Sequence, residues 1–207
     1  MADVSDHDAA TLVALETAVE ALPPLTRVVF LLHRVDDLSY DAIARRLSIG
    51  VPVVESGVAD ALYRLCCTLD GDTAERAMPE ALADAHALLS RRYRRYCEDK
   101  LRALDITAPV PWNDGEDDDV AVTRAMLQSM VRAVLQAFIL NQFENLNCVQ
   151  IAERTGTCRW IVRGRMLRGM RRIARRPMSF ERWLRDIRAA DCDHSRSYRV
   201  TVANDRF

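Results

Sequence analysis

Apolar residues recur along most of the chain at intervals of three or four, the spacing of an α-helix with one buried face. In residues 9–21, for example, Leu12, Leu15 and Val19 share a face, and the prolines at 23–24 end that helix. The same pattern predicts further helices at residues 25–34, 39–47 (with Ser39 as N-cap), 51–69, 79–105, several within 120–175, and 180–190. We therefore expect an all-α fold, with a short strand at 198–202 as the one alternative in a polar tail.

Turn and linker signals divide this helical pattern. Asp, Gly and Asp at 70–72 mark a turn, and residues 109–119 concentrate proline, glycine and carboxylates. The expected organisation is a first domain at 1–72, a connecting helix and acidic linker at 73–119, a second domain at 120–176, and a C-terminal helix and tail at 177–207. Phe180, Trp183 and Leu184 are expected to dock the C-terminal helix onto the second domain.

The second half of the chain repeats the first. A shift of 108 residues aligns 27–65 with 135–173 without a gap, and Phe30 then meets Phe138. The shared positions are mostly apolar ones in the same helical register, which predicts an internal duplication of one small helical domain.

Each copy has helix-turn-helix spacing. An alanine is followed four residues later by a small turn residue and, six residues after that, by a valine; the two sets are Ala44, Ser48 and Val54, and Ala152, Gly156 and Val162. The alanine must be small because the second helix crosses closely over it, and glycine suits a turn with positive φ. The valine is expected to be the first core contact of the recognition helix.

The first copy resembles a known domain. The segments LPPLTRVVFLLHRV at 22–35 and LSYDAIARRL at 38–47 are similar to region 4 of the extracytoplasmic-function sigma factors of the sigma-70 family. The similarity covers residues 10–69 well and 122–176 more loosely, and no counterpart of the family's region 2 is found. It implies a helix-turn-helix that reads promoter DNA, contacts the flap of the RNA polymerase β subunit and is covered by anti-sigma factors.

Charge distinguishes the two copies. The net charge of −1 is the sum of −11 over residues 1–121 and +10 over 122–207, so a polyanion partner is expected for the second half. The core stripe of its recognition helix is predicted to be Val162, Met166, Met170 and Ile173. The remaining surface gives the DNA-binding candidates Arg159, Trp160, Arg163, Arg165, Arg168, Arg171, Arg172 and Arg175. The segment IVRGRM at 161–166 places Arg163 and Arg165 where the family presents basic side chains to the major groove, and arginine can bind both phosphate and guanine.

The first copy keeps the expected core stripe, Val54, Val58, Leu62 and Leu65, but lacks this basic chemistry. Its residues at the positions of Arg159, Arg163, Arg165 and Arg168 are Val51, Glu55, Gly57 and Asp60. We therefore expect Val51, Glu55, Asp60 and Tyr63 to form a protein contact. Two alternatives are that the first copy only packs against the second, or that its acidic face masks the arginine helix.

Other functions lack support in the sequence. No nucleophile–base pair or phosphate loop is present, so no enzyme activity and no cofactor are expected. The six cysteines form no CxxC motif and no metal cluster, and reduced thiols in a cytoplasmic protein are expected. No apolar run approaches the ~20 residues of a membrane span, and no membrane partner is expected.

The sequence thus favours a bacterial sigma-factor-like transcription regulator whose second domain binds double-stranded DNA. The alternative is a sigma-mimicking module that binds RNA polymerase or an anti-sigma factor without reading DNA. Oligomeric state, target sequence and the direction of regulation are open at this point.

Overall fold

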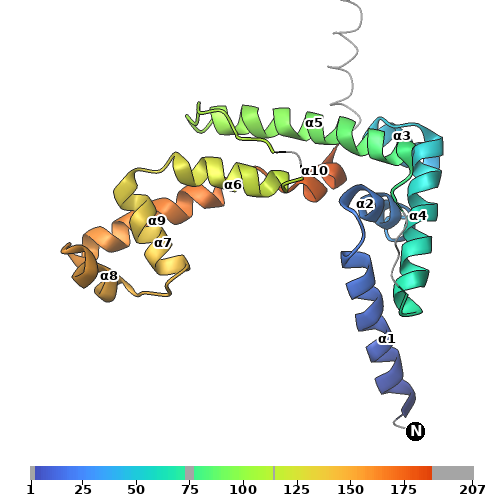
Figure 1. The fold of residues 1–207 in the computed structure, drawn as a ribbon, viewed down its shortest axis with the longest axis horizontal. Coiled ribbons are helices and arrows are strands. Elements are labelled where there is room, and N and C mark those ends of the chain that lie inside the picture. Colours follow the sequence, from blue (N-terminus) through green and yellow to red (C-terminus); the bar gives the residue numbers. More distant parts are fainter. Residues whose placement is uncertain (1–2, 73–76, 114, 188–207) are drawn as a thin grey trace, which may run out of the picture. The chain divides into compact units, whose positions relative to one another are not determined.

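A computed structural model describes residues 3–72, 77–113 and 115–187, with the side chains of residues 3–10 left out (Figure 1). The described parts are helical, with no strand among them. The helices are α1 (Asp3–Glu20), α2 (Pro24–Arg34), α3 (Tyr40–Leu47), α4 (Val51–Leu69), α5 (Glu80–Arg102), α6 (Asp118–Gln128), α7 (Arg132–Gln142), α8 (Cys148–Thr155), α9 (Arg159–Ala174) and α10 (Phe180–Asp186). The all-α expectation is confirmed for these residues, whereas the strand considered at 198–202 lies outside them.

The chain forms two compact units whose boundary differs from the expected one. Unit 1 contains the described residues up to Ser90 together with α10, and unit 2 spans Arg91–Ser179, so the division falls inside α5. Helix α10 packs against α2 of unit 1 and not onto the second domain. Its Phe180 and Leu184 are buried, and Glu181 forms an ion pair with Arg27 of α2. The apolar residues of α10 predicted that it packs against another helix, but they could not show that this helix is α2.

Unit 1 is built around α2, α3 and α4. Ser39 caps α3 by accepting a hydrogen bond from the Ala42 amide, and Ser48 ends it in the left-handed conformation at φ 53°. The turn brings α4 back across α2 and α3, where Val54 and Val58 are buried. Only the end of α1 reaches this core, through Ala18 against Ala61 and Leu65 of α4.

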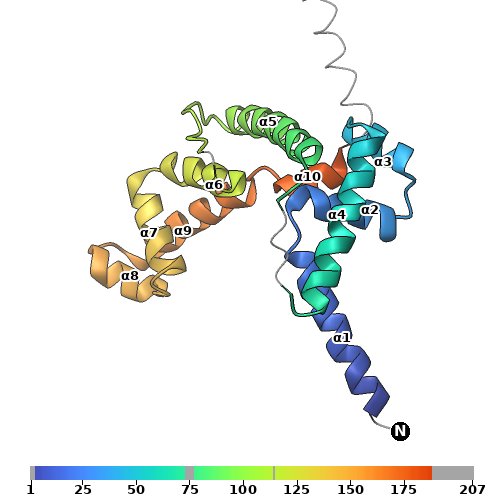
Figure 2. The same ribbon diagram turned by 45° about the vertical axis from the view of Figure 1, so that its right-hand side comes forward.

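Unit 2 contains a matching set of helices, α7, α8 and α9 (Figure 2). Each begins 108 residues after its counterpart α2, α3 or α4. Asn147 caps α8 where Ser39 caps α3, and Gly156 takes the left-handed conformation, at φ 63°, where Ser48 does. Asp37 and Asn145, also 108 residues apart, share a positive φ of 51° and 54° before these helices.

The predicted core stripes are wrong at one position in each unit. Leu62 and Met170 were expected inside, but their exposed fractions are 41% and 48%. The residue before each, Ala61 or Gly169, faces the core instead. Small residues at these positions let α4 approach α2 and α9 approach α7 closely, which turns the larger neighbour outward. Only Val162 of the four predicted α9 core residues is fully buried, while Met166 and Ile173 are half-buried.

Asp60 also departs from the expectation that it lies on an exposed acidic surface. Its exposed fraction is 3%, and its carboxylate accepts hydrogen bonds from Thr26 Oγ1 (3.3 Å) and Arg64 Nε (2.9 Å). The carboxylate is tolerated inside because Arg64, one turn further along α4, compensates its charge. Glu55 and Tyr63 are exposed as expected, and Val51 is half-buried.

A pair of glycines in α9 tests the close approach to α7. A Cβ added at Gly169 would lie 3.1 Å from Phe138 Cδ2 and 3.3 Å from its Cβ, whereas one at Gly164 meets nothing within 4 Å. We expect Gly169→Ala to lower the free energy of unfolding by about 1–2 kcal/mol through overpacking. Gly164→Ala should raise it by about 0.5–1 kcal/mol through helix propensity. Urea denaturation measures both, and equal effects would contradict the close packing.

A second pair, on α4, tests the buried carboxylate. Asp60→Ala leaves Arg64 and Thr26 without their shared acceptor, so we expect a loss of about 2–3 kcal/mol in unfolding free energy. Glu55→Ala, which removes an exposed carboxylate from the same helix, should change it by less than about 0.5 kcal/mol. Chemical denaturation of both variants decides the matter; two equally small effects would place Asp60 at the surface after all.

Candidate nucleic-acid interface

Three buried side chains fix the position of α9 in unit 2. Val162, in the first turn of α9, packs against Leu140 of α7 and Ile151 of α8. Residues 156–158 connect α8 to α9, and this short turn is possible because Gly156 adopts a positive φ. This packing buries one side of α9 and leaves the opposite side to solvent.

The exposed side of α9 is rich in arginine. Residues 159–176 contain eight arginines and no acidic residue. Among the residues that the structure describes, none of these arginines forms an ion pair with a carboxylate. The positive charge is therefore not compensated within this part of the chain, which suits a polyanionic ligand.

The structure separates the eight predicted DNA-binding residues into two groups. Six are exposed: Arg159, Trp160, Arg163, Arg168, Arg171 and Arg175. Arg165 and Arg172 are half-buried, and Arg172 Nη2 donates a hydrogen bond to Ser129 Oγ at 3.2 Å. Arg172 thus joins α9 to the end of α6, while the exposed group provides the charge that a ligand can meet.

Trp160 lies among these arginines with 62% of its surface exposed. The guanidinium carbons of Arg159 and Arg163 are 5.1 Å and 6.0 Å from the centroid of its ring. At these distances the cations are attracted to the ring face, which orients all three side chains at the start of α9.

An open apolar groove of about 470 Å³ continues from Trp160 along α9. Its lining residues are Cys148, Arg159, Trp160, Arg163, Met166, Leu167 and Met170. Leu167 and Met170 are 44% and 48% exposed. Sequence reasoning missed this groove because helical spacing placed Met170 in the core.

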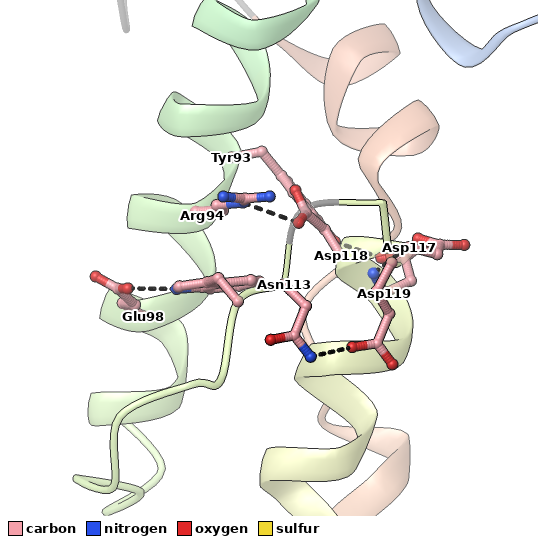
Figure 3. A network of polar contacts seen from close by, with 9 residues as sticks. Tyr93, Arg94, Glu98, Asn113, Asp117, Asp118 and Asp119 are labelled. Atoms are coloured by element: carbon pink, nitrogen blue, oxygen red, sulfur yellow. Dashed lines mark hydrogen bonds and ion pairs between the residues drawn. The ribbon is translucent and has the colours of Figure 1, made fainter.

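A buried tyrosine of α5 contacts the start of α6 (Figure 3) and also the chain segment that follows α9. Tyr93 of α5 is fully buried, and its Oη lies 2.5 Å from Asp119 Oδ1 and 2.9 Å from the carbonyl oxygen of Met178. Burial is the main cause that raises the pKa of the Tyr93 phenol, and its hydrogen bond to Asp119 raises the pKa further. The neutral phenol has a single O–H proton, which these two acceptors share, and it links α5 to both segments.

The acidic residues expected to form a linker are engaged in the same region. Arg94 Nε donates to Asp118 Oδ1 at 2.9 Å, and Trp112 Nε1 donates to Glu98 at 2.8 Å (Figure 3). Burial raises the pKa of Asp118, an effect that Arg94 opposes. Hydrogen bonds from Arg124 hold the pKa of Glu116 below its usual range. These carboxylates are thus paired with Arg94 and Arg124 and leave the α9 arginines uncompensated.

Helix α4, the counterpart of α9 in unit 1, has different chemistry. Its single basic residue is Arg64, which pairs with the buried Asp60. The position of the exposed Arg163 is taken by the exposed Glu55. The same helix-turn-helix geometry therefore presents a basic face in unit 2 and a neutral to acidic one in unit 1.

Among the described helices, none combines the length and the hydropathy that a bilayer span requires. Within the same residues, no group of three His, Cys, Asp or Glu side chains could hold a metal ion.

Comparison with known proteins identifies one of these units. Residues 12–65, from α1 through most of α4, match the family described as sigma-70, region 4. No curated protein and no solved structure matches the chain. The matched residues are about a quarter of the sequence and lie in unit 1. The first unit is thus similar to the helix-turn-helix domain of sigma factors, as its sequence predicted.

Proposed function

We propose that the protein is a sigma-factor-like transcription regulator in which α9 of unit 2 contacts duplex DNA and unit 1 makes protein contacts. The observation that carries this proposal is the exposed arginine face of α9, on a helix-turn-helix and without acidic partners. The proposed activity is binding in the cytoplasm, without catalysis or a cofactor.

An internal duplication of the region 4 unit is part of the proposal. It is supported by the matching starts of three helices, by the two left-handed turns at Ser48 and Gly156, and by the paired positive φ values of Asp37 and Asn145. By this reasoning the similarity of residues 12–65 to sigma-70 region 4 extends to unit 2.

In the proposed complex, the first turns of α9 enter the major groove. Arg163 is exposed there and can bind guanine through both of its terminal nitrogens. Arg175, at the other end of α9, is placed to contact phosphate. The half-buried Arg165 is expected to contribute less than its position in the sequence suggested.

Unit 1 supports a second candidate function. The match to sigma-70 region 4 falls on unit 1. The one basic residue of its helix α4 is Arg64, whose charge is compensated by Asp60. This combination favours a protein-binding role through Glu55, Tyr63 and the half-buried Val51. The resemblance implies the flap of the RNA polymerase β subunit or an anti-sigma factor as the partner. A chain that uses unit 1 alone would be a sigma mimic that does not read DNA.

DNA binding by the full chain tests the main proposal. If about four to six phosphates are contacted, the logarithm of affinity should fall with the logarithm of salt concentration at a slope of about −4 to −5. Arg163→Ala should cost about 1–3 kcal/mol and relax the preference at one base pair, whereas Arg175→Ala should weaken all sequences equally. Fluorescence anisotropy with labelled duplexes measures these effects.

Arg182→Ala provides the matched control, because this exposed arginine lies on α10 of unit 1. It should leave the affinity within about twofold of wild type. A folded chain whose binding does not respond to salt would contradict the proposal. Absence of DNA binding together with capture of RNA polymerase through unit 1 would favour the sigma mimic.

A further inference from the structure

Helix α1 has little packing between Thr11 and Thr17. Its N-terminal turns extend beyond the other helices of unit 1 (Figure 1), and every side chain from Thr11 to Thr17 is exposed. Leu12 is 60% exposed and Leu15 39%, although they continue the stripe that packs on α4 through Val19. An isolated helical segment of this length is only marginally stable in water. Burial of its apolar stripe against another surface would stabilise it.

The charge of α1 indicates which kind of surface would bind it. The helix contains five acidic residues and no lysine or arginine. Glu16 follows Leu12 by four residues, so its carboxylate lies on the same face as the exposed leucines. The surface that α1 offers is therefore apolar with acidic flanks.

The groove on α9 has the complementary composition. Trp160, Leu167 and Met170 give it an apolar floor, and Arg159 and Arg163 line its basic end. Both surfaces are exposed within the described chain, so each is available to another molecule. Each copy of the chain carries one exposed acidic helix and one exposed basic groove, so two copies can pair the helix of one with the groove of the other.

We propose that α1 of one copy docks in the α9 groove of a second copy. Leu12 and Leu15 pack on Trp160, Leu167 and Met170, and the α1 carboxylates meet Arg159 and Arg163. Dimer formation and DNA binding then exclude each other, because both occupy the exposed side of α9. This last consequence rests on the proposed function, while the contact between copies does not.

Sedimentation velocity of the full chain without DNA tests the contact. A contact limited to one helix and one groove is small, and we expect a dissociation constant of about 10 μM at low salt. The double variant Leu12→Ser, Leu15→Ser should raise it at least about tenfold, as should Leu167→Ser, because each removes apolar burial. Val35→Ser is the matched control, since Val35 is 67% exposed on unit 1 outside both surfaces, and it should change nothing.

A charge exchange identifies the partners within the contact. Glu16→Arg and Arg163→Glu should each raise the dissociation constant about tenfold, and their combination in one chain should restore it to within about threefold of wild type. All substituted side chains are exposed, so circular dichroism should report an unchanged fold.

A chain that stays monomeric at about 100 μM would overturn the proposal, since most of it should then be dimeric. The proposal would also be overturned if the leucine substitutions left the dissociation constant unchanged. It would likewise be overturned if combining Glu16→Arg with Arg163→Glu failed to restore that constant. Added duplex DNA should convert the dimer into a complex with one protein chain per site. A complex in which α9 binds DNA and α1 of another copy at the same time would overturn the mutual exclusion.

Discussion

The short turn between α8 and α9 and the buried Val162 that follows it are the constraint on which the candidate site depends. Gly156 supplies the left-handed conformation, and Val162 then inserts between Leu140 and Ile151. Because these contacts fix the rotation of α9 about its own axis, they decide which side chains meet solvent. Arg159, Trp160 and Arg163 are exposed for this reason, and any ligand of α9 must accommodate cations and an aromatic ring together.

The two units show how one scaffold can carry different surfaces. The caps, the turns and the buried valines correspond in both, so packing alone does not distinguish α4 from α9. Charge does. In α4 the one arginine compensates the buried Asp60, whereas in unit 2 the nearby carboxylates are engaged with α5 and α6 and not with the arginines of α9. Helix α9 thus presents a basic face, whereas α4 presents a neutral to acidic one.

Local signals in the sequence predicted much of this. Helix α4 has the predicted bounds, and Ser39 is the N-cap as expected, because both depend on neighbouring residues. The errors concern relations between helices. Spacing alone cannot tell that Ala61 and not Leu62 faces α2, since this depends on how closely the helices approach. Likewise, the docking of α10 on α2 depends on Arg27, more than 150 residues away.

The burial of Asp60 departs from the sequence expectation, because an acidic residue on an amphipathic helix is typical of its exposed face. A compensating Arg64 one turn away was a local signal that could have indicated the interior. The apolar groove on α9 carried no comparable signal. Of its lining residues, helical spacing assigns Met166 and Met170 to the core, and only the rotation of the packed helix shows that Met170 is exposed.

The central claim is that α9, and not α4, meets DNA, and photocrosslinking from corresponding positions tests it most directly. Trp160 and Pro52 are both exposed and occupy the second position of their helices. A photoreactive phenylalanine analogue is placed at either position in the full chain, which is then irradiated with duplex DNA at low salt. The account predicts a covalent DNA adduct from position 160 and none from position 52. Adducts from position 52 alone, or from neither position while DNA is bound, would contradict it.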